Sequence, residues 1–371
     1  MNAYEPLFPP AKQGFRMPAE WEPHDATWLA WSHGSLDWPG KISPIPWVFA
    51  EMVRKIAVGE KVRILAGSAA QEDHAVRVLS RVGVLAPGSS SPAVEFFRIP
   101  TNRAWTRDYG PIYIRRETPH PEIAIAGFRF NAWARYPDYD RDSRVSELIA
   151  RATHRVRYSA QCRGEEVVLE GGSIDVNGRG SLLTTEECLL DREVQARNPH
   201  LERSDIETVL GDYLGVSNVI WLGRGIVGDD THGHVDDICR FVAPGTVVLC
   251  RESNPHDENY RALEENAERL QGCRREDGTP IETVFLPMPA PLFMEGRRLP
   301  ASYANFFIAN QVVIVPTFND PSDRVALGIL AELFKDRTVV GIHAVDLVWG
   351  RGTLHCLTQQ EPRADITCGV S

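Results

Sequence analysis

The sequence predicts an α/β fold, because short β-type runs alternate with amphipathic helical segments along its whole length. The β-type runs have the lengths of strands and are rich in Val, Ile and Phe. They outnumber the helical segments, which indicates that some strands pair antiparallel as well as through βαβ crossovers. No low-complexity linker divides the 371 residues, and we therefore expect a single domain over residues 1–371.

The first strand is expected at TWLAW (27–31), after a Pro-rich stretch over residues 1–22 that we expect to wrap over the surface. Beyond it, apolar runs predict strands at VRILAG (62–67), VEFFRI (94–99), IYI (112–114), IAIAGF (123–128), VVLEGG (167–172), SLLTT (181–185), VIWL (219–222), TVVLC (246–250), TVFLP (283–287), ANFFIAN (304–310), QVVIVP (311–316), VVGI (339–342) and TLHCL (353–357).

Helical segments lie between these strands. In WVFAEMVRKIA (47–57), Val48, Met52 and Ile56 recur every four residues and form one apolar stripe. Ser204 and Glu207 fit a capping box at the start of a later helix. Stripes of the same kind predict helices at 72–84, 204–216, 258–271 and 323–335. The Pro, Ser and Gly residues of 85–94 and 274–282 predict surface loops.

The composition is that of a globular protein, with 43% hydrophobic and 24% charged residues and a formal net charge of −10. Basic residues do not cluster, so we expect no nucleic-acid partner. No apolar stretch approaches the roughly 20 residues of a membrane helix, and the N-terminus lacks a secretory signal, so we expect no membrane contact. The acidic surface is compatible with a cationic substrate without demanding one.

The seven cysteines are scattered and odd in number, and none forms a CxxC pair. This usage indicates a reducing compartment, the cytoplasm, in which most of the thiols serve as small core residues. The sequence leaves the oligomeric state open, a homo-oligomer included.

The first cluster of chemistry-bearing residues lies in NRAWTRDYGPIYI (102–114), where Trp105, Arg107 and Asp108 precede a Gly-Pro turn. Loops on rigid scaffolds often carry functional sites, and a carboxylate beside an indole suits a flat cationic group. A purely structural alternative is that Asp108 caps backbone N–H groups and that Arg107 pairs with it.

The second cluster is GDDTHGHVDDICRF (228–241). If residues 231–238 are extended, His232, His234 and Asp236 share one face and Asp237 lies on the other. This arrangement fits a His–Asp pair for acid–base chemistry and cation binding. It also fits a metal site, although it is not HExxH and offers just three ligands in line. A polar strand edge without chemistry is the structural alternative.

The third cluster is GRGTLHCLTQQ (350–360), in which Cys356 is expected near the end of a strand, pointing away from His355 and Leu357. The flanking glycines permit close backbone approach, and the polar run at 358–360 is poorly suited to a core. Cys356 is therefore a candidate nucleophile, with a buried structural thiol as the alternative.

Glu170 adds a further acid, since it precedes Gly171-Gly172 in an otherwise apolar predicted strand. A carboxylate there needs a buried partner, and orienting a histidine would supply one. Taken together, the clusters provide a thiol, an imidazole and three carboxylates, which is a candidate set for nucleophilic catalysis.

These segments resemble the agmatine deiminase family, which includes the bacterial-type peptidylarginine deiminases and belongs to the guanidine-modifying superfamily. The resemblance covers nearly the whole chain, from about Met17 to Gln360. The segments that carry it are MPAEWEPHDATWLAW (17–31), WTRDYGP (105–111), NAW (131–133), LEGGSIDVNGRGSLLTTEECLL (169–190), VIWLGRG (219–225), THGHVDD (231–237) and LHCLTQQ (354–360).

The resemblance implies a five-bladed α/β propeller, the pentein fold, built from ββαβ units about a pseudo-fivefold axis. It also implies a small cationic guanidino substrate. Agmatine would be hydrolysed to N-carbamoylputrescine and ammonia through an S-amidino cysteine adduct, a step toward putrescine and other polyamines. The family uses no metal and no organic cofactor.

The motif match also implies a role for each matching residue. Asp108 and Asp236 would clamp the guanidinium, and Cys356 would be the nucleophile. His234 would be the general acid/base, oriented by Glu170. Trp105 would help to wall the site.

The chain departs from the family pattern at two places. Many members read GGGNxHC before the nucleophile, whereas this chain reads GRGTLHC, with Arg351 and Thr353. In addition, THGH replaces the commoner TNGH and brings His232 beside the site. An additional arginine favours a substrate that carries a carboxylate, such as arginine or a derivative, over agmatine, whose far end is an amine. The alternative is that Arg351 faces solvent or an internal acid.

The substrate is therefore less determined than the reaction type. Deimination of peptidylarginine or of a free arginine derivative is the alternative within the class, and an amidinotransferase would require an amine acceptor in place of water. Outside the class, the alternatives are a metallohydrolase built on His232, His234 and Asp236 and a binding protein without activity on the same fold. The presence of every expected catalytic residue argues against the last of these.

Overall fold

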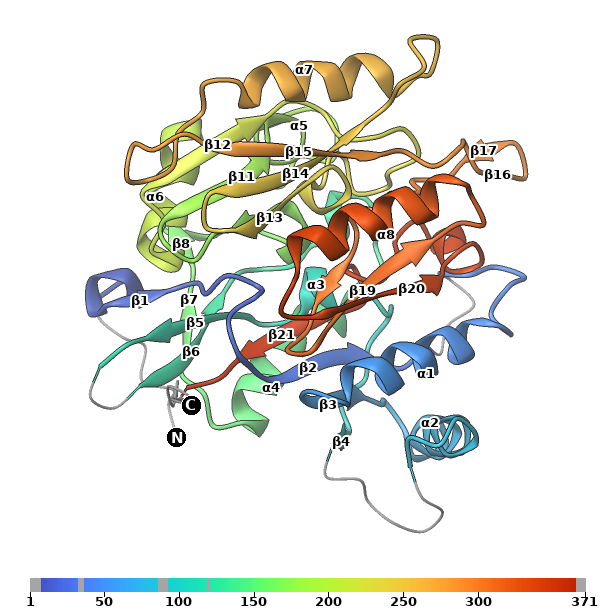
Figure 1. The fold of residues 1–371 in the computed structure, drawn as a ribbon. Helices are drawn as coiled ribbons and strands as arrows, with labels where there is room; N and C mark the ends of the chain where they lie inside the picture. Colours follow the sequence, from blue (N-terminus) through green and yellow to red (C-terminus); the bar gives the residue numbers. More distant parts are fainter. Residues whose placement is uncertain (1–7, 33–36, 86–92, 119–120, 365–371) are drawn as a thin grey trace.

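The computed structural model describes residues 8–32, 37–85, 93–118 and 121–364, and its architecture is mixed α/β (Figure 1). Within these residues, five sheets share one plan, in which an antiparallel strand pair is extended by a strand that runs parallel to its neighbour. One or two helices connect the parallel strands of each sheet. The α/β class predicted from the sequence is confirmed, including the antiparallel pairs.

The five sheets, listed in hydrogen-bonded order, comprise the following strands. They are β21 (Gln359–Pro362), β2 (His24–Ala30), β3 (Lys61–Leu65) and β4 (Val94–Phe97); β1 (Phe15–Arg16), β5 (Ile112–Arg116), β6 (Glu122–Gly127) and β7 (Arg157–Ser159); β10 (Asp175–Val176), β11 (Ser181–Thr185) and β12 (Asn218–Leu222); β13 (Cys239–Ala243), β14 (Thr246–Arg251) and β15 (Glu282–Pro287); and β18 (Phe307–Ile308), β19 (Val312–Thr317) and β20 (Thr338–His343). Two short hairpins join β8 (Gln161–Cys162) to β9 (Glu165–Glu166) and β16 (Phe293–Met294) to β17 (Arg297–Arg298).

The α-helices are α1 (Ile45–Ile56), α2 (Ala69–Arg81), α3 (Thr106–Tyr109), α4 (Val145–Ala152), α5 (Glu186–Leu190), α6 (Arg203–Leu214), α7 (Tyr260–Leu270) and α8 (Ser322–Leu333). The 3-10 turns are η1 (Pro10–Gln13), η2 (Ala132–Ala134), η3 (Asp142–Arg144), η4 (Gly171–Ser173), η5 (Val235–Asp237) and η6 (Leu347–Gly350). None of the described helices is both long and apolar enough to cross a membrane.

The long helices form where the sequence places an apolar stripe. In α1, Ile45, Phe49, Met52 and Ile56 are buried along one face. In α6 the predicted capping box shifts by two residues, because Glu202 is the N-cap and exchanges hydrogen bonds with the third helical residue, Asp205.

Strands from opposite ends of the sequence close one sheet. Strand β2 pairs antiparallel with β21, so that Trp28 faces Gln359. The indole Nε1 of Trp28 also donates to the buried Glu361 carboxylate at 2.9 Å. The turn that carries Cys356 directly precedes β21, and the closing strand therefore fixes its position.

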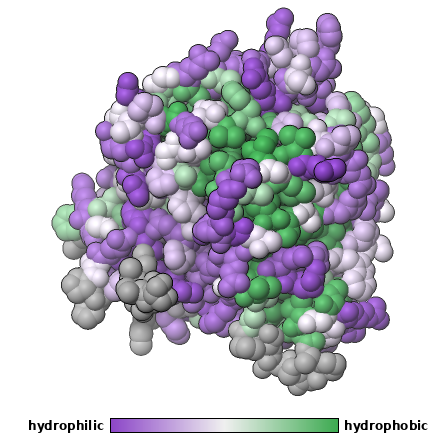
Figure 2. Space-filling model, in the orientation of Figure 1, coloured by the Kyte–Doolittle hydropathy of each residue, from purple (hydrophilic) through white to green (hydrophobic). Residues whose placement is uncertain are grey.

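Apolar side chains form three buried clusters among the described residues, the largest of which includes Trp28, Phe49, Phe306 and Ile314. Figure 2 shows further apolar surface gathered over α8 and the neighbouring strands, where Val325 is 53% exposed.

Most predicted strands and all predicted long helices are confirmed to within a few residues. Three segments differ. Residues 167–172 form an isolated bridge at Val168 followed by η4, the segment 231–238 contains η5 in place of an extended strand, and 354–357 is a turn. In each, glycines or side-chain hydrogen bonds replace the regular strand ladder.

The expectation that residues 1–22 wrap over the surface is wrong for residues 17–20. Met17, Ala19 and Glu20 are buried, and the carboxylate of Glu20 accepts a hydrogen bond from the Ile308 backbone N–H at 2.7 Å. Of the loop predicted at 85–94, residues 86–92 lie outside the described part of the chain.

Candidate active site

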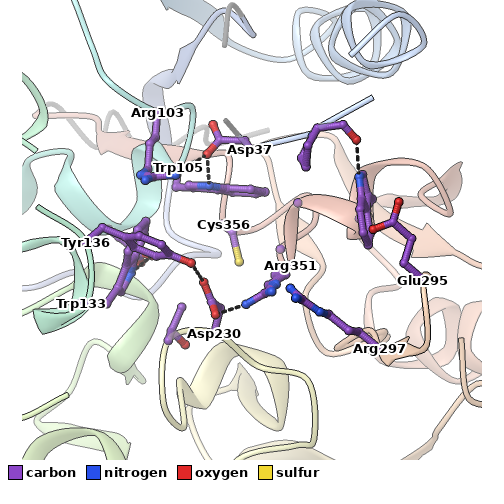
Figure 3. Close-up of a pocket in the computed structure, with 16 residues that line it drawn as sticks. Asp37, Arg103, Trp105, Trp133, Tyr136, Asp230, Glu295, Arg297, Arg351 and Cys356 are labelled. Atoms are coloured by element: carbon purple, nitrogen blue, oxygen red, sulfur yellow. Dashed lines mark hydrogen bonds and ion pairs between the residues drawn. The ribbon is translucent and has the colours of Figure 1, made fainter. Parts of the chain in front are cut away.

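A cavity of about 210 Å³ opens beside Cys356 (Figure 3). Its inner part includes the side chains of Asp108, Trp105 and Cys356, and its outer part includes charged residues from several loops. The lining residues are Asp37, Pro39, Arg103, Trp105, Asp108, Trp133, Tyr136, Asp230, Thr231, Glu295, Arg297, Trp349, Gly350, Arg351, Gly352 and Cys356.

Cys356 lies in the turn before β21 and is 6% exposed. The side-chain amide Nδ2 of Asn305 donates to its Sγ at 3.1 Å, and Oδ2 of Asp236 lies 3.7 Å from the same sulfur. Gly352 makes room for this arrangement, because a Cβ at that position would lie 2.7 Å from Trp105 and 3.1 Å from Cys356. The predicted close backbone approach is thus present, although the predicted strand is not.

The surroundings of Cys356 disfavour its thiolate. Burial is the largest cause that raises the pKa of this thiol well above its ordinary value, and the acids Asp236, Asp237 and Asp108 raise it further. The site as built therefore favours the thiol form of Cys356 over the thiolate.

Asp108, on α3, reaches the cavity with both oxygens hydrogen-bonded. Its Oδ1 accepts from the Gly172 backbone N–H at 3.1 Å, and its Oδ2 accepts from the indole Nε1 of Trp133 at 2.8 Å. Burial nevertheless raises the pKa of this carboxyl to about 6, with Asp236 and Glu170 acting in the same direction.

Trp133 lies in a left-handed turn, since Ala132, Trp133 and Ala134 have φ of 53°, 57° and 51°. Asn131 stabilises the turn by accepting the Ala134 backbone N–H at 2.9 Å. The turn aims the Trp133 indole at Asp108 and so fixes that carboxylate. Although NAW (131–133) belongs to the resemblance, no role for Trp133 was predicted from it.

His234 sits between two carboxylates. Its Nε2 lies 3.6 Å from Oε2 of Glu170, and its Nδ1 lies 3.7 Å from Oδ1 of Asp108. Both ring nitrogens lack a hydrogen-bond partner among the described residues. Burial lowers the pKa of His234, but Asp108, Cys188 and Glu170 outweigh it and raise the pKa well above its ordinary value. An imidazole with unpaired nitrogens between two acids is suited to receive and deliver protons.

Glu170 is fully buried directly before η4, and Arg197 donates to it from Nε at 3.1 Å. Burial raises the pKa of Glu170, but Arg197 and then His234 lower it below its ordinary value. The structure thus supplies the buried partner that the sequence argument required, together with a second one, Arg197, that was not predicted.

Asp236 is held by a histidine that the sequence argument overlooked. Nδ1 of His355 lies 2.7 Å from Oδ2 of Asp236, and Nε2 lies 2.7 Å from Oε2 of Glu20. Oδ1 of Asp236 is buried without a partner among the described residues. Burial raises the pKa of Asp236, but the hydrogen bond and charge of His355 lower it below its ordinary value. Asp236 therefore stays ionised, with one oxygen free for a ligand.

Glu20 anchors the far side of this chain of contacts. Its Oε2 lies 3.0 Å from Arg240 and 3.3 Å from Arg107. Burial raises the pKa of Glu20, but Arg240, His355 and Arg107 together lower it well below its ordinary value. Each ring nitrogen of His355 thus faces a carboxylate oxygen.

His232 is not part of this set. Its Nε2 lies 2.9 Å from Oδ2 of Asp191, and its backbone φ is 64°. The described groups of at least three candidate metal ligands within 4.8 Å are Glu170, Cys188 and His234, and Asp236, Asp237 and Cys356. The single-faced trio of His232, His234 and Asp236 required an extended strand, which η5 replaces.

The outer part of the cavity contains the residue at which the chain departs from the family pattern. Arg351 pairs through Nη1 with Oδ1 of Asp230 (Figure 3). Arg351 therefore faces an internal acid, as the alternative in the sequence analysis supposed, and it also lines the cavity. Trp105 lines the cavity as expected, and its indole Nε1 donates to Asp37 at 3.1 Å.

Comparison with known proteins gives matches over nearly the whole chain. The model of the family described as Porphyromonas-type peptidyl-arginine deiminase matches residues 16–362. An agmatine deiminase of Pseudomonas aeruginosa (strain LESB58) is 36% identical over 380 residues, which cover 96% of this chain and 98% of that protein. An agmatine deiminase of Medicago truncatula is 38% identical over 385 residues, covering 95% and 98%. The resemblance drawn from the motifs is thus confirmed.

Solved structures agree in fold. The agmatine deiminase of Enterococcus faecalis superposes with a TM-score of 0.87 at 32% identity, covering 97% of this chain and 100% of that one. An amidinotransferase from Microseira wollei superposes with a TM-score of 0.50 at 13% identity, covering 95% and 98%. These likenesses identify the fold as the pentein fold.

Proposed function

The chain belongs to the Porphyromonas-type peptidyl-arginine deiminase family, and we propose that it hydrolyses agmatine to N-carbamoylputrescine and ammonia. Relatives that are agmatine deiminases match it almost end to end. The observation that carries the proposal is the cavity itself, which the Cys356 thiol and the Asp108 carboxylate line and which is sized for a small molecule. Asp236 lies against the sulfur, and the His234 imidazole lies against Asp108, directly behind this lining.

In the proposed complex, the planar guanidinium enters between Asp108 and Asp236. Carboxylates bind such a group through paired charge-assisted hydrogen bonds, and the free Oδ1 of Asp236 offers one acceptor. Asp108 is held by Trp133 and Gly172, and Asp236 by His355, so neither acid has to be ordered when substrate binds. This clamp holds the guanidinium carbon against Sγ of Cys356.

The substrate also activates the nucleophile. In the empty site Cys356 is a thiol, because burial and acids oppose its ionisation. A guanidinium brings a positive charge that favours the thiolate, and the thiol proton passes to a neighbouring base as the S–C bond forms. We propose that His234 protonates the departing nitrogen. Ammonia leaves as the C–N bond breaks, and an S-amidino adduct of Cys356 remains.

Hydrolysis of the adduct uses the same residues in reverse. His234 removes a proton from water, the resulting oxygen attacks the amidino carbon, and the C–S bond breaks. The product carries a ureido group, and the sulfur regains its proton. Glu170, held by Arg197, supports the protonated form of His234 during both halves.

The five like sheets support a finer description of the fold. We infer that they are the blades of a five-bladed propeller with pseudo-fivefold symmetry, and that the chain is one domain over residues 1–371. The six described cysteines are free, which agrees with our proposal that the protein works in the cytoplasm.

Steady-state release of ammonia from agmatine and from a peptidylarginine, by wild type and Cys356→Ala, tests the function. We expect wild type to convert agmatine to N-carbamoylputrescine without an amine acceptor and with the higher kcat/KM, because a cavity of about 210 Å³ suits a small compound better than a peptide. Cys356→Ala should lose turnover while keeping its fold, since one small buried truncation costs only a few kcal/mol.

Chelation and thiol alkylation separate the thiol mechanism from a metallohydrolase. We expect a chelator to leave turnover unchanged and alkylation of Cys356 to abolish it. Loss of activity with the chelator, together with full activity after alkylation, would overturn the proposal in favour of metal chemistry.

A further inference from the structure

Arg351 occupies a backbone position that favours glycine. It ends the 3-10 turn η6 with φ of 69°, in the left-handed region, which side chains other than glycine adopt only with strain. The side chain is 29% exposed, and its guanidinium points into the cavity rather than into solvent (Figure 3).

The carboxylate opposite Arg351 already has three donors. Asp230 accepts from Nη1 of Arg351 and from the hydroxyl of Tyr136, and Nε of Arg135 lies 3.2 Å from its Oδ1. Two guanidinium groups therefore share a single carboxylate. An ammonium at the far end of a substrate would have to displace Arg351 to pair with Asp230.

Arg297 brings a second guanidinium group to the outer part of the cavity. It lies on the hairpin β16–β17, lines the same cavity and makes no ion pair within the described part of the chain. Figure 3 shows its guanidinium directed toward Arg351, whereas the carboxylate of Glu295 is directed away from both. The guanidinium of Arg103 is not free to bind a substrate anion, because it already pairs with Asp37 and Asp138.

The two ends of the cavity thus present different groups to a ligand, carboxylates at the inner end and guanidinium groups at the outer end. The inner end presents Asp108 and adjoins Asp236, and the outer end presents Arg351 and Arg297. Nε and Nη2 of Arg351 make no hydrogen bond within the described residues, so they are available for a bidentate contact with a planar anion while Nη1 keeps Asp230.

We propose that this outer end gives the enzyme a second substrate class, ω-guanidino carboxylic acids whose carboxylate is bound by Arg351. The inference rests on the proposed function, because the guanidino end reacts at Cys356 in the same way. The ω-guanidino acid and water give the ω-ureido acid and ammonia, and no further reactant is needed. The same arginine raises the KM for agmatine.

The test compares agmatine with 4-guanidinobutanoate, which has a similar length and a carboxylate in place of the amine. Ammonia release is measured for wild type, Arg351→Asn, Arg351→Lys and Arg261→Asn. Asn tolerates the left-handed backbone, so Arg351→Asn removes the charge without adding strain. Arg261 is exposed on α7, away from the cavity, and its variant controls for the loss of one positive charge.

Wild type is expected to hydrolyse 4-guanidinobutanoate with saturable kinetics. Arg351→Asn should lower kcat/KM for the acid by about 10- to 100-fold through KM, as expected for a lost hydrogen bond between charged groups, and raise kcat/KM for agmatine severalfold. Arg351→Lys should fall between them, and Arg261→Asn should match wild type.

No turnover of the acid by wild type, or equal effects of Arg351→Asn on both substrates, would overturn the inference. Turnover of the acid without turnover of agmatine would instead refute the proposed function and leave the role of Arg351 standing.

Discussion

Adding a single methyl group at Gly172 is expected to displace the catalytic side chains and to lower activity strongly. The backbone φ of Gly172 lies outside the left-handed region, so alanine can adopt the same backbone conformation. A Cβ there would lie 2.5 Å from Nδ1 of His234 and 2.8 Å from Oδ1 of Asp108. Ordinary van der Waals separation is about 3.5 Å, so the imidazole has to retreat by about 1 Å.

A displacement of about 1 Å in a positioned catalytic group lowers the rate on the order of 100-fold. We therefore expect Gly172→Ala to reduce kcat/KM for agmatine by about that factor. Overpacking of the buried site should lower the free energy of unfolding by about 1–3 kcal/mol, which leaves a protein of this size folded. Ammonia release and urea unfolding measure the two effects separately.

Gly328→Ala is the matched control. Gly328 lies within α8, where a Cβ would have nothing within 4 Å, and alanine in a helix interior is favoured over glycine by about 0.8–1.0 kcal/mol. This variant should be as active as wild type and slightly more stable. Full activity of Gly172→Ala, with the fold intact, would refute the steric reasoning and the assigned geometry of His234 and Asp108.

Four further outcomes are expected. The kcat/KM for agmatine should fall as the pH drops through about 6, because burial raises the pKa of Asp108 to about 6 and its protonated form no longer attracts a guanidinium; a flat profile from pH 5 to 7 would contradict this. The same carboxyl titrates near 3.8 when unfolded, so its contribution to the free energy of unfolding declines as the pH rises from about 4 to about 6. The ultraviolet absorbance of the Cys356 thiolate, taken as the difference from Cys356→Ala, should be absent from the empty enzyme at neutral pH; a full thiolate signal there would refute activation by substrate. Finally, His355→Gln should raise KM for agmatine by at least about 10-fold, more than it lowers kcat, because Asp236 loses its 2.7 Å partner; an unchanged KM would show that the histidine does not position this acid.

The sequence predicts the regular elements well, because their apolar patterns are local. The run 311–316 is apolar throughout and forms β19, and the stripe of 47–57 forms most of α1. The same logic failed at 353–357, where the pattern suits a strand. Here Asn305, which is about 50 positions away, accepts the His355 backbone N–H and the Thr353 hydroxyl.

The candidate site divides in the same way. Cys356, His234 and Asp108 can be predicted from their residue types and from the glycines that flank them. In the structure, Cys356 and Asp108 line one cavity and His234 lies next to Asp108. Glu20 and His355 were missed because their contact joins residues 335 positions apart. The Pro-rich stretch over residues 1–22 gives no local sign that Glu20 will be buried beside a histidine.

The left-handed turn Ala132–Ala134 has a consequence for how this protein balances robustness against performance. Three consecutive residues with side chains hold a backbone shape that costs each of them about 1–2 kcal/mol. The strain at one such residue is a substantial fraction of the net free energy of unfolding of a typical domain, which is about 5–15 kcal/mol. Strain of this kind is retained at functional positions, so substitutions that relax this turn are expected to stabilise the fold and to loosen the Trp133 indole that holds Asp108.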